Sequence, residues 1–230
     1  MHGGGLRFKC GMRSVFGALA MLFAATAAAG EDISARIQKS VAVLDKLDDC
    51  LGKCLQPEEL SGVDCMAIIP GFYRGAAVTG EVFRDGPLFE TSFGRGFISC
   101  RRGDQWSPPD AITLDAGSRA TQIGENFDVV ILGTSASVCS RMFSHLTIEM
   151  LSSPVAPNRS DPELKILILR GNGKISAGTH LQGAVLQPDV HANKALYGKL
   201  AENPEIFTGE RAIPTRAQPL ISRLSALFRR

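Results

Sequence analysis

The chain has 230 residues, which fits one domain or a small pair at the usual size of roughly 150 residues per domain. Its composition, 44% hydrophobic and 21% charged, is that of a globular protein and excludes disorder as the main state. The formal net charge is +2, but Arg7, Lys9 and Arg13 precede residue 30 and no acidic residue does. The rest of the chain therefore carries a net charge of −1, which argues against nucleic acid as a partner.

Residues 1–30 have the pattern of a secretory signal peptide. The three basic residues come first, and residues 15–29 form an uninterrupted apolar and small-residue run that ends in Ala27-Ala28-Ala29. This run is shorter than the roughly 20 residues that a membrane-spanning helix needs. We expect cleavage after Ala29 or Gly30, and a periplasmic or secreted product.

The next segment is predicted to be an amphipathic helix that begins behind the capping residues Asp32 and Ser34. Apolar residues recur along it every three or four positions: Ile33, Ile37, Val41, Leu44, Leu47, Leu51 and Leu55. Its other faces mix acidic residues with Arg36, Lys39 and Lys46, a pattern more typical of a solvated face than of a membrane-binding one.

Short runs that favour strands follow, separated by Gly- and Pro-rich turns such as Gly171-Asn172-Gly173. They cover residues 65–69, 71–78, 94–100, 127–133, 146–151, 164–170 and 174–186. Helices are expected at 135–144, 189–200 and 219–230. Few spacers are long enough for a crossover helix, so we predict an α+β fold with a largely antiparallel sheet or barrel-like core and amphipathic helices at both ends. We place the domain at 31–200 and a C-terminal extension at 201–230.

Cysteine usage fits an oxidising compartment. Cys50, Cys54, Cys65, Cys100 and Cys139 follow residue 30, and at least one disulfide is expected among them. The sequence does not choose among the pairings, and we favour a bridge from Cys65 to Cys50 or Cys54. The Cys50-x-x-x-Cys54 spacing is also half of a metal site, but no second pair completes it. We therefore expect neither a metal nor another cofactor.

Catalytic patterns are weak. His145, His180 and His191 stand in no nucleophile-elbow or zinc-protease motif. The glycine-rich turn at 171–176 fails the phosphate-loop spacing because Ile175 stands where a hydroxyl is needed. Three carboxylates, Asp110, Asp115 and Asp128, have no feature that pairs them as acid and base. The sequence therefore predicts a protein that is not an enzyme.

Arginines are the more informative residues. Six of them lie at predicted turns and strand ends: Arg74, Arg84, Arg95, Arg101, Arg102 and Arg119. Arginine binds phosphate in a bidentate manner, so such a group could hold phospholipid head groups. An equal number of acidic residues lies nearby, so structural ion pairs are the alternative.

A series of short motifs resembles the SYLF domain, a lipid-binding domain also found in yeast and animal actin regulators. The first half of that domain is matched by Ala67-Ile68-Ile69-Pro70 with Gly75-Ala76, Gly94-Arg95-Gly96, Ser99-Cys100-Arg101 and Trp106-Ser107-Pro108-Pro109-Asp110-Ala111-Ile112. The second half is matched by Gln122-Ile123-Gly124 with Asp128-Val129-Val130, Ala177-Gly178, Leu186-Gln187-Pro188-Asp189, Asn193-Lys194 and Leu196-Tyr197-Gly198. The last group is similar to the exported bacterial branch of the family. Residues 152–159 and 169–171 depart from the family pattern.

The resemblance implies binding to anionic phospholipid or another lipid ligand. It points to the N-terminal amphipathic segment and nearby basic residues as the contact, with Arg74 as the foremost single candidate. The expected lipid-contact residues are Arg74, Arg95, Arg101, Arg102, Arg36, Lys39 and Lys46. The alternative is an envelope protein–protein interaction module without a lipid ligand.

Overall fold

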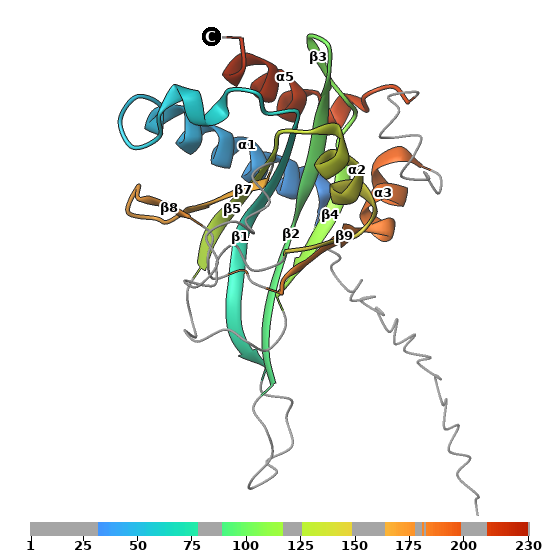
Figure 1. The fold of residues 1–230 in the computed structure, drawn as a ribbon. Coiled ribbons are helices and arrows are strands. Elements are labelled where there is room, and N and C mark those ends of the chain that lie inside the picture. The colour runs from blue at the N-terminus through green and yellow to red at the C-terminus, as the bar shows by residue number, and fades with distance from the viewer. Residues whose placement is uncertain are drawn as a thin grey trace, which may run out of the picture. The chain divides into compact units, whose positions relative to one another are not determined.

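The structure is a computed structural model, and it describes residues 32–77, 89–116, 126–148, 164–177, 181, 183–198 and 211–229 (Figure 1). The predicted signal peptide lies outside these residues, as do Arg84, Arg119 and His180. The side chains of residues 74–77, 89–92 and 177 are likewise not described. Among the helices of the described part, none is long and apolar enough to cross a membrane.

Every strand pairing in the described part is antiparallel. The strands are β1 (Cys65–Ala77), β2 (Phe89–Arg102), β3 (Gln105–Trp106), β4 (Asp110–Asp115), β5 (Asn126–Gly133), β6 (Leu146–Thr147), β7 (Leu164–Leu169), β8 (Ile175–Ala177) and β9 (Val185–Pro188). Their order is β6-β9-β4-β2-β1-β5-β7-β8, and β3 pairs with the end of β2. The sheet curls into a half-barrel, so the predicted α+β class with an antiparallel, barrel-like core is confirmed.

Two predicted strands, 65–69 and 71–78, are one strand with an irregularity at Pro70 and Gly71. The pairing of β1 with both neighbours changes register at this point, as in a β-bulge. Gly71 has a φ of 60°, a conformation that glycine adopts without steric cost, and its N–H donates to Asp128 Oδ1 at 2.9 Å. The Asp128 carboxylate therefore supports the bulge, a structural role that the sequence did not predict.

The prediction of one strand over 174–186 is wrong. Its two ends form β8, which lies at one end of the strand order, and β9, which lies next to the other end. The glycine turn at 171–173 closes the β7–β8 hairpin, as expected. Strand β4 was not predicted, because Pro108 and Pro109 hide the start of a short alternating run in the sequence.

One face of the sheet is covered by helices from both ends of the chain. Helix α1 (Ile33–Cys50) crosses it, with α3 (Val190–Tyr197) and α5 (Gln218–Leu227) alongside (Figure 1). Helix α1 ends five residues before the predicted end, and Gly52 follows with a φ of 74°. Four buried residues of α5 join the core under α1: Leu220, Ile221, Leu224 and Leu227. The segment that we treated as an extension thus packs into the same core.

The other face carries α2 (Ala136–Ser144), which begins three residues after β5 ends. The Oγ atom of Ser135 caps the helix by accepting the Val138 N–H at 3.3 Å. Below the helix lies a second buried cluster that includes Cys65, Cys100, Val138, Cys139 and Met142. Successive residues of β1 alternate between the two clusters, so the sheet separates two cores.

Candidate functional site

Two of the predicted lipid contacts are structural residues. The Arg36 side chain is only 3% exposed, and its Nη1 donates to Asp189 Oδ2 at 2.9 Å. A buried, paired guanidinium cannot touch a membrane, so the prediction for Arg36 is wrong. Lys46 Nζ lies 2.7 Å from Asp128 Oδ2 and thereby links α1 to the bulge in β1. Periodicity placed both residues on α1 but did not reveal their partners.

The remaining predicted basic residues do not form one surface. Lys39 is exposed on α1. Arg74 lies opposite Ser92 in the β1–β2 pair, and its side chain is outside the described part. The Arg95 guanidinium lies 5.0 Å from the ring centre of Phe93. Arg102 is exposed at the C-terminal end of β2. It lies seven residues beyond Arg95, which is roughly 20 Å at the usual rise along a strand.

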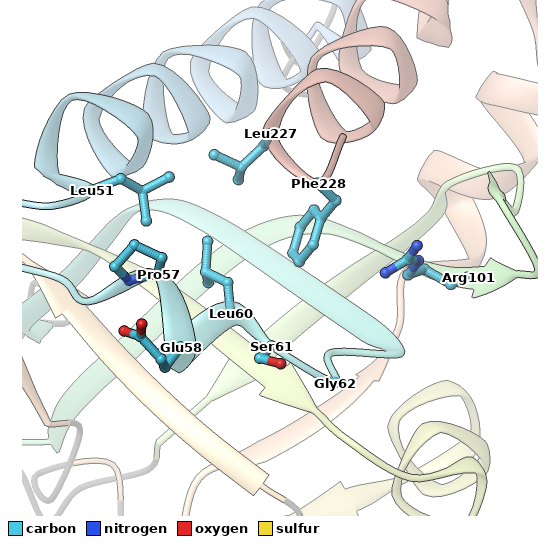
Figure 2. A pocket seen from close by; sticks show the side chains of 9 residues that line it. All are labelled: Leu51, Pro57, Glu58, Leu60, Ser61, Gly62, Arg101, Leu227 and Phe228. Carbon is cyan, nitrogen blue, oxygen red and sulfur yellow. The ribbon is translucent and has the colours of Figure 1, made fainter. Parts of the chain in front are cut away.

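Two of the predicted basic residues line pockets: Lys46 borders a cavity of about 110 Å³ beside the glycine turn, and Arg101 borders a larger groove. This groove, of about 410 Å³, lies between the end of α1, the short helix η1 (Pro57–Leu60), the end of β2 and the end of α5. Figure 2 shows the side chains that line it. Its lining residues are Leu51, Pro57, Glu58, Leu60, Ser61, Gly62, Arg101, Leu227 and Phe228. Leu60 and Leu227 are buried and form its floor. The groove thus combines leucine, proline and phenylalanine side chains with the polar side chains of Glu58, Ser61 and Arg101.

Backbone and aromatic contacts position Arg101. Its N–H donates to the Asp64 carbonyl at 2.6 Å, just before β1 begins. Its guanidinium lies 5.9 Å from the ring centre of Phe228, and that ring packs on Trp106 with 5.0 Å between centroids. The contact with Phe228 is at the outer limit of a cation–π interaction. Arg101 as a residue is partly buried, and its side chain lines the groove (Figure 2).

The wall opposite Arg101 is fixed by η1. Gln56 N–H donates to Glu59 Oε2 at 3.3 Å, and Lys165 Nζ of β7 lies 3.2 Å from Glu59 Oε1. These contacts hold η1 between α1 and the sheet. Glu58, the acidic residue of the lining, lies across the groove from Arg101 (Figure 2). An anionic group is therefore favoured at the Arg101 end only.

Two of the SYLF-like motifs meet away from this groove. Asn193 of α3 accepts the Ala111 N–H at 2.7 Å, donates to the Ala111 carbonyl at 3.0 Å, and also donates to Asp110. Tyr197 donates its hydroxyl proton to the Pro109 carbonyl at 2.6 Å. These motif residues fasten α3 to β4.

Asp110 is the unusual group in this contact. It is fully buried, and burial raises its pKa to about 7, against the lowering effect of the Asn193 hydrogen bond. The nearby carboxylate of Asp189 raises the pKa further. Burial also raises the pKa of Tyr197. Asp110 is thus a structural carboxyl that titrates near neutral pH.

The cysteine pairing differs from the one we favoured. Cys50 and Cys54 pair with each other across the end of α1, with Cα atoms 5.2 Å apart. Cys65 contacts Cys100 and Cys139 on the other face of the sheet. The favoured bridge from Cys65 to Cys50 or Cys54 is therefore wrong, because Cys65 points away from α1 into the second core.

Sequence reasoning missed most of the groove. Leu51 and Leu227 were assigned to apolar helix faces, but nothing in the pattern showed that both helices end at the same place. No site role was predicted for Pro57 or Ser61. The available signal was an apolar residue, Leu60, between Pro57 and the Ser61-Gly62 pair.

No family model, curated protein or solved structure matches this chain.

Proposed function

We propose that this chain is an exported SYLF-like domain that binds anionic phospholipid at a membrane surface and catalyses no reaction. The observation that carries the proposal is the groove in which Arg101 faces apolar side chains from α1, η1 and α5. The sequence resemblance supports the same ligand class. Of the seven predicted lipid-contact residues, the proposal now depends on Arg101 and the groove that it lines.

The chemistry of the groove suits a phospholipid. A guanidinium can donate two parallel hydrogen bonds to a phosphate. Because the Arg101 guanidinium already packs against Phe228, ordering its side chain on binding costs less conformational entropy. Leu51, Pro57 and Phe228 offer apolar surface to the upper part of an acyl chain. A volume of about 410 Å³ falls within the usual range for small-ligand sites, roughly 300–1,000 Å³. The phosphate would lie at the Arg101 end, away from Glu58.

Co-sedimentation with vesicles tests the proposal. The mature protein should bind vesicles of equal parts phosphatidylcholine and phosphatidylglycerol, and bind pure phosphatidylcholine much less. Added salt should weaken binding, because the Debye length is about 8 Å at physiological ionic strength and shortens as salt increases. One basic residue near an anionic surface contributes about 1 kcal/mol, so Arg101→Gln should weaken binding roughly fivefold.

Arg95→Gln is a matched control for Arg101→Gln. Both arginines lie on β2 and both pack on a phenylalanine ring, but Arg95 lies outside the groove. We expect Arg95→Gln to bind like the wild type. Ser61→Trp, which places a large side chain at the exposed rim, should reduce binding by filling the groove. Equal effects of the two arginine changes, or equal binding to both vesicle types, would contradict the proposal.

A second candidate function, docking of an envelope protein, is favoured by a different surface. Tyr73 and Phe93 lie opposite each other on β1 and β2 and are 53% and 40% exposed. Arg95 packs on this pair through Phe93. Exposed aromatic and arginine side chains are enriched at protein interfaces. Absence of vesicle binding, with loss of a co-purifying partner on Arg95→Gln but not on Arg101→Gln, would favour this function.

A further inference from the structure

Three cysteines that play no part in the proposed function meet beneath α2. Cys65 of β1 lies opposite Cys100 of β2, and Cys139 reaches them from α2. All three are buried, with at most 4% exposure, and their sulfur atoms lie within 4.8 Å of one another. The sulfur of Cys65 contacts both of the others. Cys65 is therefore the central member of the group.

A sulfur atom forms one disulfide bond at a time, so Cys65 can bridge only one neighbour. The Cα atoms of Cys65 and Cys139 are 5.7 Å apart, within the usual disulfide range of roughly 4.4–6.8 Å. Those of Cys65 and Cys100 are 4.0 Å apart, which is below that range. The backbone therefore favours the bridge to Cys139 and leaves the Cys100 thiol beside it.

A soft metal ion is the competing occupant, since three thiols in one place suit such an ion. Metal-binding cysteines must lose their protons, however, which would bury negative charge. The neighbouring side chains of the cluster are apolar, among them Val138, Met142 and Phe143 of α2. Three thiolates around a divalent ion leave one uncompensated negative charge among these side chains, which is costly, whereas a disulfide is neutral. The surroundings thus favour a disulfide.

We propose that Cys65 forms two alternative disulfides, with Cys139 or with Cys100, which interconvert by thiol–disulfide exchange. When α2 opens transiently and admits solvent, the Cys100 thiol ionises; its thiolate attacks the Cys65 sulfur, a Cys65–Cys100 bond forms, and the Cys65–Cys139 bond breaks. The Cys139 sulfur leaves with the electron pair and takes up one proton, matching the proton that Cys100 gave up. The exchange involves no net oxidation. A small disulfide such as oxidised glutathione supplies the oxidant for the first bridge.

The two bridges have different mechanical consequences. The Cys65–Cys139 bridge ties α2 covalently to the central strand β1. The Cys65–Cys100 bridge joins two strands that are already paired, and leaves α2 without a covalent link to the sheet. Exchange therefore switches the covalent attachment of one helix. It takes place on the face of the sheet opposite the lipid groove, so its test does not depend on the proposed function.

The distribution of the free thiol tests the proposal. The full mature chain is equilibrated in a glutathione redox buffer, quenched with acid, unfolded, alkylated and mapped by peptide mass. Among Cys65, Cys100 and Cys139, we expect one alkylated residue in each molecule. It should be Cys100 in most molecules and Cys139 in the rest. Alkylation of only one of these two residues, three free thiols, or one metal ion held by all three cysteines would overturn the proposal.

Variants of α2 sharpen the test. Met142→Ala removes buried packing between α2 and the sheet, so it should shift the free thiol several-fold from Cys100 toward Cys139. Ser140→Ala, on the exposed side of the same helix, should leave the distribution unchanged. Replacing Cys50 and Cys54 together by Ser should also leave it unchanged. A distribution that Met142→Ala does not alter would contradict a role for the docking of α2.

Discussion

The two faces of the sheet are held together by different means. On the α1 face, ion pairs join segments that are far apart in the chain: Arg36 with Asp189, Lys46 with Asp128, and Arg223 with Asp45 and Asp48. On the other face, α2 follows β5 after a short connection and covers three sulfur atoms in an apolar cluster. Helices brought together from both ends of the chain need directional contacts to fix their positions. A helix that directly follows its strand needs fewer of them.

The largest expected effect is on the α1 face. Arg36→Met leaves the Asp189 carboxylate poorly solvated, so we expect the free energy of unfolding to fall by about 3–5 kcal/mol in urea denaturation. Arg36→Met with Asp189→Asn should recover part of this loss, because the orphaned charge is removed. Lys39→Met, exposed on the same helix, should change stability by no more than about 0.5 kcal/mol. A loss below about 1 kcal/mol for Arg36→Met would show that the pair does not specify this face.

On the α2 face the corresponding test is Cys65→Ala. A bridge from Cys65 closes a span of 74 or 35 residues, so the chain-entropy model predicts a loss of about 4 kcal/mol in oxidised protein. The Cys50–Cys54 bridge spans 4 residues, and its removal by Cys54→Ala should cost about 2 kcal/mol. Urea denaturation with and without reductant measures both values. Equal losses would contradict the stronger covalent constraint on the α2 face.

The pH dependence of stability separates Asp110 from the ion pairs around it. Burial raises its pKa in the folded state to about 7, from 3.8, so the folded protein holds a proton that the unfolded chain has released. The free energy of unfolding therefore decreases as pH rises from about 4 to 8. Between pH 5 and 8 the wild type should lose about 3 kcal/mol more than Asp110→Asn, as measured by denaturation at each pH. Asp115→Asn, on the exposed end of the same strand, should retain the wild-type dependence.

The smallest expected effect concerns the attachment of α5. Arg223 donates to Asp48 at 2.9 Å and also to Asp45, and these hydrogen bonds raise its pKa. The cluster is partly exposed, so Arg223→Gln should lower the free energy of unfolding by about 1 kcal/mol or less. In 1 M salt the Debye length falls to about 3 Å, so exposed charges interact weakly. The difference in the free energy of unfolding between Arg223→Gln and the wild type should therefore nearly vanish in 1 M salt. A loss that persists in high salt would indicate that packing, and not charge, is affected.

Much of the fold was predictable because its signals are local. The 3.6-residue period is confirmed over 33–50 of the predicted 33–55, the helix predicted at 135–144 is present as Ala136–Ser144, and the glycine turn at 171–173 is present. Each of these signals depends on neighbouring residues. The α+β class followed from the short spacers between strands. The predicted boundaries of strands that pair with segments far away in the chain were less accurate. Strand β4 could be recognised only from its pairing with β9. The same is true of segment 174–186, whose two ends belong to different strands with different partners.

The candidate site shows the same limit. By itself, the sequence determined which residue types are available: an arginine at the end of a strand, apolar faces on the terminal helices and five cysteines after the predicted leader. Only the tertiary structure decided that Arg101 and Phe228 meet, that Arg36 is buried, and that Cys65 faces Cys100 and Cys139 and not Cys50. Spacing along the chain sets the face on which a residue lies. The partner across that face comes from another part of the chain, so it depends on how the elements pack together.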